Sequence, residues 1–291
     1  MSMIRLAIIG IGYWGSKIAN TCDTINEITT LRYDINDDWK SCNYDCAIVA
    51  TPAETHFEIA SYLLNKHIPT MVEKPVGIDL DEVKSLCDLA HKQNTILQTG
   101  HILLFTKSTE YILENINAND IKLVETRRCA AGSIPKHQIS LSHHLLIHDL
   151  ALMDYFSAGS IQDLQAGSSD IISTPNPDYE NFTIKWDKFT SNHTVSWYYP
   201  GKVRNVVVCT EHDLISVDDV SNTVHHTIGS YNGKLEVQDP KEFKLLDSAT
   251  PLRREIENFV NSVHTGNKNS RNNTDHITRV YSNLELILKH V

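Results

Sequence analysis

The stretch LAIIGIGYWGSKIAN, residues 6–20, decides how the N-terminal half of this 291-residue chain is interpreted. An aliphatic run ends in the pattern G-x-G-x-x-G, formed by Gly10, Gly12 and Gly15. A run that is apolar on both faces is typical of a parallel strand covered by helices. The first glycine permits a tight turn, the second lets a pyrophosphate approach the backbone, and the third lets a helix pack on the strand. The stretch predicts a strand, a turn and a helix that begins near Trp14, with the helix N-terminus facing a dinucleotide.

An acidic residue supports a dinucleotide-binding turn over the alternative, a glycine-rich turn without a ligand. The predicted second strand, TTLRYD at 29–34, ends at Asp34, 19 residues after Gly15. This is close to the spacing at which a carboxylate binds the ribose of NAD. The alternative is that Asp34 is a helix cap or a solvated acid of the loop DINDD at 34–38. No arginine follows closely, and a carboxylate repels a 2′-phosphate, so NAD is favoured over NADP.

Strand and helix patterns then alternate, which predicts an α/β fold with a doubly wound parallel sheet. We expect strands at 44–51, 69–75 and 95–100, and helices at about 54–65 and 79–93. The connection at 36–44 is too short for more than about one helical turn. Ligands bind beyond the carboxyl ends of such strands, where the pattern places Thr51, Pro52, His56, Glu73, Lys74 and His101. A surface lysine before a turn proline is the alternative for Lys74.

The second half of the chain has a different pattern. After about residue 105, a polar helix is followed by alternating strands at 121–128, 181–189, 193–199 and 203–210. Two amphipathic helices, at 252–264 and 275–290, are expected to pack on the body of the protein, although such faces could equally bind a partner. We therefore expect two domains, 1–104 and 105–291.

Composition excludes several classes of function. The formal charge of −10, from 26 Lys and Arg against 36 Asp and Glu, opposes binding to a nucleic-acid backbone. Six scattered cysteines without a C-x-x-C pair favour reduced thiols over disulfides or a zinc site, and so a cytoplasmic protein. No apolar run is long enough for a membrane span, and the run from Ile4 to Ile9 is too short for a signal peptide. We expect a small-molecule substrate and neither a nucleic-acid nor a membrane partner.

Five segments together resemble the glucose-fructose oxidoreductase/inositol dehydrogenase/MocA-like (Gfo/Idh/MocA) family of oxidoreductases. They are GIGYWG at 10–15, AIVATPAETHFEIA at 47–60, VEKPVG at 72–77, LLIHDLALMDYF at 145–156, and SWYYPGKVRNVVVCTEHDLISVDD at 196–219. The last segment is most similar to the branch of the family that acts on nucleotide-linked sugars. The resemblance implies a Rossmann domain that binds NAD or NADP. It also implies a second α+β domain whose open, largely antiparallel sheet supports a homo-oligomer, either a dimer or a tetramer.

The same resemblance implies the site residues. Oxidation of a secondary alcohol needs a base and a nearby cation, and Lys74 and His148 match the catalytic lysine and histidine of the family. An aspartate often stands four residues before that histidine, but this chain has His144 there. On a helix His144 and His148 would share a face, so His144 could replace the aspartate, and Asp149 could orient the helix. The cofactor-binding set is Gly10, Gly12, Tyr13, Trp14, Gly15, Asp34, Thr51, Pro52, His56, Glu73 and Lys74.

The segment HHLLIHD at 143–149 leaves other functions open. Its histidines could hold a metal, or could be satisfied by neighbours at the start of a helix. It has neither an H-E-x-x-H motif nor a clear distant ligand, so no metal site is predicted. We expect an NAD-dependent oxidoreductase that transfers a hydride between nicotinamide and a secondary hydroxyl or ketone of a sugar or nucleotide sugar, such as a UDP-sugar 3-dehydrogenase. The alternative is a non-catalytic NAD-binding sugar sensor or regulator of the same fold.

Overall fold

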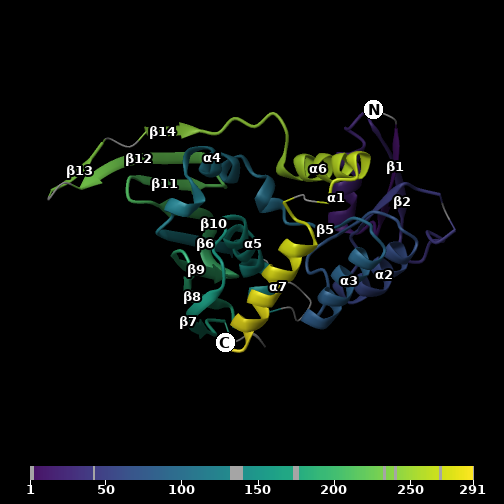
Figure 1. The fold of residues 1–291 in the computed structure, drawn as a ribbon, viewed down its shortest axis with the longest axis horizontal. Helices are drawn as coiled ribbons and strands as arrows, with labels where there is room; N and C mark the ends of the chain where they lie inside the picture. The colour runs from purple at the N-terminus through teal and green to yellow at the C-terminus, as the bar shows by residue number, and fades with distance from the viewer. Residues whose placement is uncertain are drawn as a thin grey trace. The chain divides into compact units, whose positions relative to one another are not determined.

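The chain packs into two compact units, drawn in Figure 1. The computed structural model describes residues 3–41, 43–131, 140–172, 177–231, 234–238, 241–268 and 271–290. The first unit contains residues 1–105 and 249–281, and the second contains residues 106–248 and 282–291. The chain therefore leaves the first unit close to the expected boundary after residue 104, but it returns to that unit near its end.

A parallel five-stranded sheet forms the centre of the first unit. Its strands are β1 (Ile4–Ile9), β2 (Ile28–Tyr33), β3 (Cys46–Val49), β4 (Thr70–Val72) and β5 (Leu97–Thr99), in the order β2-β1-β3-β4-β5. The connecting helices are α1 (Tyr13–Cys22), α2 (His56–Asn65), which follows a 3-10 turn at Ala53–Thr55, and α3 (Leu80–Lys92). The order of strands reverses between β1 and β3, where such sheets bind their ligands. The predicted doubly wound parallel sheet is confirmed.

Local sequence chemistry explains how these elements form. Strand β1 is central because its aliphatic side chains are buried on both faces, as Leu6 and Ile9 illustrate at 0% exposure. The side chain of Asp79 caps α3 by accepting a hydrogen bond from the backbone N–H of Glu82 at 2.8 Å. The described residues between β2 and β3 form no helix, as the length of this connection predicts.

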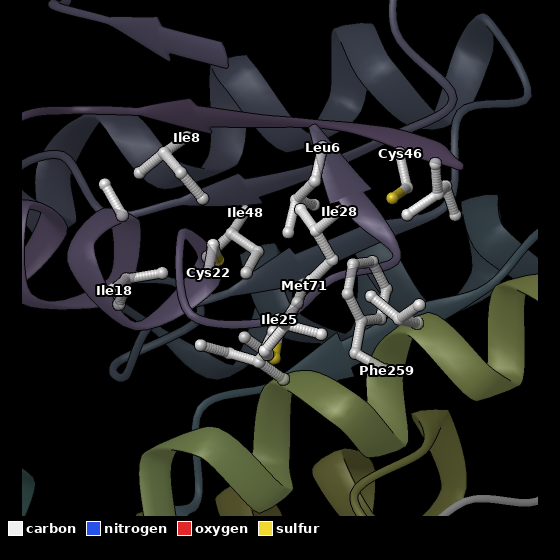
Figure 2. Close-up of a cluster of buried hydrophobic side chains, with 14 of the residues drawn as sticks. Leu6, Ile8, Ile18, Cys22, Ile25, Ile28, Cys46, Ile48, Met71 and Phe259 are labelled. Carbon is white, nitrogen blue, oxygen red and sulfur yellow. The ribbon is translucent and has the colours of Figure 1, made fainter. Parts of the chain in front are cut away.

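Helix α6 (Pro251–Thr265) belongs to the first unit although it lies near the end of the sequence. Its Ile256 and Phe259 are fully buried and pack into the same cluster as Leu6, Ile48 and Met71. Figure 2 shows Phe259 pointing from the helix into this cluster. The expected assignment of the whole segment 105–291 to a second domain is therefore wrong for residues 249–281, because the apolar face of α6 completes the core of the Rossmann sheet.

The second unit is built on a mixed, mostly antiparallel sheet. Strands β6 and β9 run parallel, and the other neighbouring pairs run antiparallel. The order is β13-β12-β11-β10-β6-β9-β8-β7, with β14 paired to β12, and the predicted largely antiparallel sheet is confirmed. The strands are β6 (Leu123–Ala131), β7 (Ile161–Ser169), β8 (Tyr179–Trp186), β9 (Thr190–Ser196), β10 (Tyr198–Cys209), β11 (Asp213–Asp218), β12 (Thr223–Tyr231), β13 (Leu235–Val237) and β14 (Lys241–Lys244).

The remaining helical elements include one irregular segment. Helix α4 (Lys107–Asn115) begins the second unit, and a π-helical turn at Ser142–Leu146 leads into α5 (Ile147–Tyr155). Short 3-10 turns lie at Ile102–Phe105 and Ala118–Asp120. Helix α7 (Thr274–Leu288) belongs to the first unit as far as Tyr281 and to the second from Ser282. No helix within the described ranges combines the length and the apolar character that crossing a membrane requires.

The role of α6 can be tested with Phe259→Ala. Loss of a fully buried phenylalanine should lower the free energy of unfolding by about 3 to 5 kcal/mol. Leu246→Ala is the control because Leu246 is 89% exposed, and it should change the free energy by less than about 0.5 kcal/mol. Urea denaturation followed by circular dichroism measures both values. An equally small loss for Phe259→Ala would contradict the placement of α6 in the Rossmann core.

Candidate functional site

Gly10 and Gly15 allow α1 to approach β1 closely. Gly10 has a φ of +98°, which other residues rarely adopt, and a Cβ there would lie 2.7 Å from backbone atoms of Ala50 and Thr51. A Cβ on Gly15 would lie 1.8 Å from the carbonyl oxygen of Gly10. Any side chain at either position would force the helix or the neighbouring loop away. The first and third glycines thus have the geometry that the sequence predicts for turn and packing.

Gly12 has different surroundings, which fit a bound pyrophosphate. It is exposed, and a Cβ there would meet no atom within 4 Å. Gly12 is the N-cap of α1, no side chain caps this helix end, and the first turn has no acidic residue. The first N–H groups of a helix lack partners within the helix, and together with the helix dipole they attract anions. This open, uncapped end therefore suits the phosphates of a dinucleotide.

Asp34 follows β2 directly and has an exposed side chain. Its Oδ1 accepts a hydrogen bond from the N–H of Ile35 at 2.7 Å, and its own N–H donates to Oδ2 of Asp37 at 2.6 Å. These bonds fix the turn after β2, which is the loop role considered from sequence. An exposed carboxylate at this end of β2 also suits a ribose. The two roles are compatible because a carboxylate has two oxygens that accept several hydrogen bonds.

The two aromatic residues after Gly12 differ in their contacts. Tyr13 is 80% exposed, and its hydroxyl accepts a hydrogen bond from Nζ of Lys17 at 2.7 Å. Trp14 is half-buried, and its indole N–H donates to Oε1 of Glu73 at 2.6 Å. Trp14 therefore connects the start of α1 to the E-K-P segment at 73–75.

His56 ties together the loops that follow β3 and β4. It is 1% exposed, its Nδ1 lies 2.7 Å from the carbonyl oxygen of Pro75, and its Nε2 lies 2.8 Å from the carbonyl oxygen of Thr51. Burial lowers the pKa of His56, although the contacts with the carbonyl groups of Pro75 and Thr51 act in the opposite direction. The Thr51 hydroxyl accepts a hydrogen bond from the Thr55 hydroxyl at 2.7 Å. His56 thus holds the loop that carries Thr51 and Pro52 instead of offering an open ring to a ligand.

Glu73 and Lys74 follow β4 immediately and are both half-buried. Loss of water raises the pKa of the Glu73 carboxyl to about 6, although the Trp14 N–H and the charge of Lys74 act in the opposite direction. The backbone N–H of Lys74 donates to Oε2 of Glu73 at 3.3 Å. Gly100 makes room for this carboxyl, since a Cβ there would lie 2.8 Å from it. Lys74 therefore follows an acid whose position is fixed, at the same edge of the sheet as the glycine loop.

His101, which the sequence places at this edge, lies inside the first unit. It is fully buried, and its ring contacts that of His276 edge-on at 5.3 Å between centroids. Burial lowers the pKa of His101 well below its usual value, and His276 and Lys74 act in the same direction. His101 thus follows β5 at the expected edge of the sheet, but its side chain is buried, because position after a strand does not determine the direction of a side chain.

The second unit contributes the predicted histidines. Nδ1 of His144 accepts a hydrogen bond from the indole N–H of Trp197 at 3.1 Å, so the neutral ring carries its proton on Nε2. Nδ1 of His143 lies 2.8 Å from Oγ of Ser140, and burial lowers the pKa of His143. His148 is half-buried in the first turn of α5. His144 is thus joined to the SWYY segment that carries part of the family resemblance.

The helix around these histidines is not regular. His144 lies in the π-helical turn, whereas His148 lies in α5. The prediction that the two residues share a face assumed continuous α-helical spacing, and that spacing is absent here. Short π-helical turns occur frequently at functional sites.

A buried ion pair fixes the start of α5. Asp149 is fully buried, and its Oδ1 accepts hydrogen bonds from Nε and Nη2 of Arg128 at 3.0 and 2.7 Å. Asp149 therefore orients the helix, as the sequence suggests, but its partner in β6 was not predicted. The alternation of β6 was the available signal, because Val124 and Thr126 on the same face are also buried. Across the described ranges, no three His, Cys, Asp or Glu side chains gather in a group that could hold a metal ion.

The different surroundings of the glycines generate a paired test. Gly15→Ala should prevent normal folding of the first unit, because its Cβ would overlap the backbone of Gly10. Gly12→Ala meets no protein atom, so it should change stability by less than about 1 kcal/mol. It should nevertheless weaken NAD binding about tenfold or more, since the added methyl group lies where the phosphates approach. Circular dichroism and calorimetric titration measure these effects. Unchanged NAD affinity in Gly12→Ala would contradict binding of the phosphates at the N-terminal end of α1.

Comparison with known proteins extends this description to the whole chain. Residues 23–101 match the model of the Gfo/Idh/MocA oxidoreductase family, described as having an NAD-binding Rossmann fold. The chain is 23% identical over 289 residues to the UDP-N-acetylglucosamine 3-dehydrogenase of Acidithiobacillus ferrooxidans, covering 90% of each protein. It is also 25% identical over 139 residues to the rhizopine catabolism protein MocA of Rhizobium meliloti, covering 40% of this chain and 44% of that protein.

Solved structures share the fold over almost the full length. The UDP-N-acetylglucosamine 3-dehydrogenase of Acidithiobacillus ferrooxidans has a TM-score of 0.88 at 21% identity, covering 100% of this chain and 98% of that one. An oxidoreductase from Agrobacterium radiobacter, in complex with NAD⁺, L-tartaric acid and magnesium, has a TM-score of 0.81 at 11% identity, covering 99% and 96%. The Rossmann unit thus matches the model of the Gfo/Idh/MocA family of NAD-binding oxidoreductases over residues 23–101, and the chain as a whole is similar to a UDP-N-acetylglucosamine 3-dehydrogenase.

Proposed function

We propose that this protein is an NAD-dependent dehydrogenase that oxidises a secondary hydroxyl of a nucleotide-linked sugar. The 3-hydroxyl of UDP-N-acetylglucosamine is the first candidate, because the relative named for that reaction aligns with 90% of this chain. The observation that carries the proposal is the 2.6 Å hydrogen bond from Trp14 to Glu73. It joins the helix end that suits a dinucleotide to the segment that carries Lys74.

The cofactor would be held by groups that the first unit already positions. The phosphates would lie at Gly12 and the uncapped end of α1, and the ribose would bind Asp34. The loop of Thr51 and Pro52, which His56 fixes, would border the site. NAD, when bound, supplies the acceptor for the hydride that leaves the sugar carbon.

Lys74 would supply the positive charge that the reaction needs. Removal of the hydroxyl proton leaves negative charge on the sugar oxygen, and a nearby ammonium group stabilises that charge in the transition state. Lys74 is half-buried, so water screens its charge less than on an open surface. Its backbone is held by the N–H contact to Glu73 at 3.3 Å.

His148 would accept the hydroxyl proton as general base. The Arg128–Asp149 ion pair supports this role, because it fixes the helical turn in which His148 lies. His144 would act differently from the aspartate that often occupies its position. With Nδ1 bonded to Trp197, the neutral ring of His144 offers an Nε2–H donor to the substrate or to a proton relay.

Cofactor preference follows from Asp34. Calorimetric titration should show tighter binding of NAD than of NADP, because the exposed carboxylate repels a 2′-phosphate. Asp34→Ala should weaken NAD binding about tenfold or more, as expected for loss of a hydrogen bond to a charged group. The variant should also show a smaller difference in affinity between NAD and NADP. Asp37→Ala is the matched control for the turn, since it also removes a turn bond. Tighter binding of NADP to the parent protein, or an equal effect of both variants on NAD, would rule out the ribose role of Asp34.

The reaction itself is tested by following NADH formation with a panel of nucleotide sugars and free sugars. We expect turnover of UDP-N-acetylglucosamine and much slower turnover of N-acetylglucosamine alone. Lys74→Met should lower kcat and kcat/KM together by about 100- to 1000-fold with little change in NAD affinity, because Lys74 acts in the transition state. His148→Ala should reduce turnover more than His144→Ala.

Several outcomes would change this proposal. Near-normal kcat for Lys74→Met, with unchanged circular dichroism, would make Lys74 structural and the mechanism wrong. A larger loss from His144→Ala than from His148→Ala would reverse the roles of the two histidines. Binding of NAD and a sugar without turnover of any panel member would favour the alternative function, a non-catalytic NAD-binding sugar sensor or regulator.

The family resemblance also supports a homo-oligomeric, cytoplasmic enzyme. The described cysteines, which are Cys22, Cys46, Cys87, Cys129 and Cys209, are all free, as suits a reducing compartment. Cys42 lies outside the described residues. Light scattering distinguishes a monomer from the proposed dimer or tetramer.

A further inference from the structure

Two arginine residues stand side by side on the sheet of the second unit. Strand pairing places Arg204 of β10 directly opposite Arg128 of β6. The next pair on the same face, Val206 and Thr126, is buried, so both arginines lie on the buried face of the sheet. Like charges directly opposite each other on neighbouring strands destabilise a sheet unless other groups compensate them. The charges that surround each arginine therefore decide what the pair does.

The charge of Arg128 is compensated by a closed ion pair. Oδ1 of Asp149 accepts hydrogen bonds from Nε and Nη2 of Arg128 at 3.0 and 2.7 Å. The two side chains are only 5% and 0% exposed, so this pair is shielded from solvent. Asp149 lies in α5 directly after His148, the proposed base. Arg128 therefore serves as the anchor of α5 and is not available to a ligand.

Arg204 has no equivalent partner. Its side chain is half-buried, and within the described ranges its guanidinium group makes no hydrogen bond and no ion pair. Asp219, directly after β11, donates its backbone N–H to the carbonyl oxygen of Arg204 at 2.8 Å. The carboxyl group of Asp219, however, accepts a hydrogen bond from the hydroxyl of Ser108 in α4. Arg204 is thus a cation that has lost part of its hydration without gaining a direct partner.

An oxyanion is the ligand that such a group fits. A guanidinium group presents parallel N–H donors that match two oxygens of a phosphate or of a carboxylate. A half-buried guanidinium attracts an anion more strongly than an exposed one, because less water screens the charge. A nucleotide sugar carries this chemistry in its diphosphate, and a sugar acid carries it in its carboxylate.

We propose that Arg204 binds an oxyanion of the substrate, which is either the diphosphate of a nucleotide sugar or the carboxylate of a sugar acid. Arg204 pairs with Arg128 across the sheet, and Arg128 in turn binds Asp149. This connection places the oxyanion site on the same face of the sheet as the helix that carries His148. The part that Arg204 plays in turnover rests on the proposed function, but its affinity for an oxyanion can be measured without turnover.

Calorimetric titration with UDP and with glucuronate tests the binding role, with NAD present in excess to fill the dinucleotide site. Arg204→Gln should bind UDP about tenfold or more weakly than the parent protein, because charge-assisted hydrogen bonds are lost. Arg127→Gln is the matched control, since Arg127 lies on the opposite face of β6 and is exposed, and it should keep the parent affinity.

The two probes distinguish the two sources of the oxyanion. A similar loss for glucuronate with unchanged affinity for UDP would assign the site to a carboxylate. Unchanged affinity of Arg204→Gln for both probes would overturn the proposal, and so would failure of the parent protein to bind either one.

Stability separates a binding residue from a structural one. Removal of the Arg204 charge ends its repulsion with Arg128 and breaks no side-chain hydrogen bond within the described ranges. The urea midpoint of Arg204→Gln should therefore equal or exceed that of the parent protein. Arg128→Gln should lower the midpoint, because it leaves the buried carboxylate of Asp149 without its cation. A marked fall for Arg204→Gln, or its failure to fold, would make Arg204 structural and overturn the proposal.

Kinetics with UDP-N-acetylglucosamine shows whether the oxyanion site serves the proposed reaction. Arg204→Gln should raise KM about tenfold or more and leave kcat within about twofold, because a diphosphate remote from the reacting carbon is bound equally in the ground and transition states. An unchanged KM in a variant that binds UDP more weakly would overturn the role of Arg204 in substrate binding. Absence of turnover in the parent protein would instead disprove the proposed function, and the two titrations would still decide whether Arg204 binds an oxyanion.

Discussion

The close contact between α1 and β1 is the constraint on which the candidate site depends. Because Gly15 has no side chain, α1 packs against the carbonyl oxygen of Gly10, where a Cβ would lie at 1.8 Å. This approach places the uncapped helix end beside the carboxyl ends of the strands. It also brings the Trp14 indole within 2.6 Å of Glu73, so that the glycine loop and the E-K-P segment form one connected structure.

Features with short-range causes could be predicted from the sequence. The glycine motif, the start of α3 near Asp79 and the short link between β2 and β3 each depend on a few neighbouring residues. Features that depend on distant packing could not. The apolar face of α6 indicated burial, but only the fold shows Phe259 in the Rossmann core. Similarly, the inward direction of His101 and the burial of Glu255 result from elements that are far apart in sequence.

The candidate catalytic residues were identified by their resemblance to family motifs. The contacts that hold these residues in place involve other residues, which lie outside the motifs. Asp149 was visible beside His148, but its partner Arg128 lies in a strand 21 residues earlier. The presence of His144, where the family often has an aspartate, changes the charge and the hydrogen-bonding groups at this position. An aspartate would offer a negative charge and acceptor oxygens, while His144 bonded to Trp197 offers a neutral N–H donor. This change would alter how a proton leaves the site without removing the proposed base, His148.

Transfer of a hydride from a sugar carbon to NAD is tested most directly with an isotope label. UDP-N-acetylglucosamine that carries deuterium at carbon 3 would be incubated with NAD and the protein, and the NADH formed would be examined by mass spectrometry. The NADH formed should contain one deuterium atom derived from the sugar. NADH without deuterium would contradict oxidation at this carbon, and the absence of NADH would contradict oxidation of this sugar.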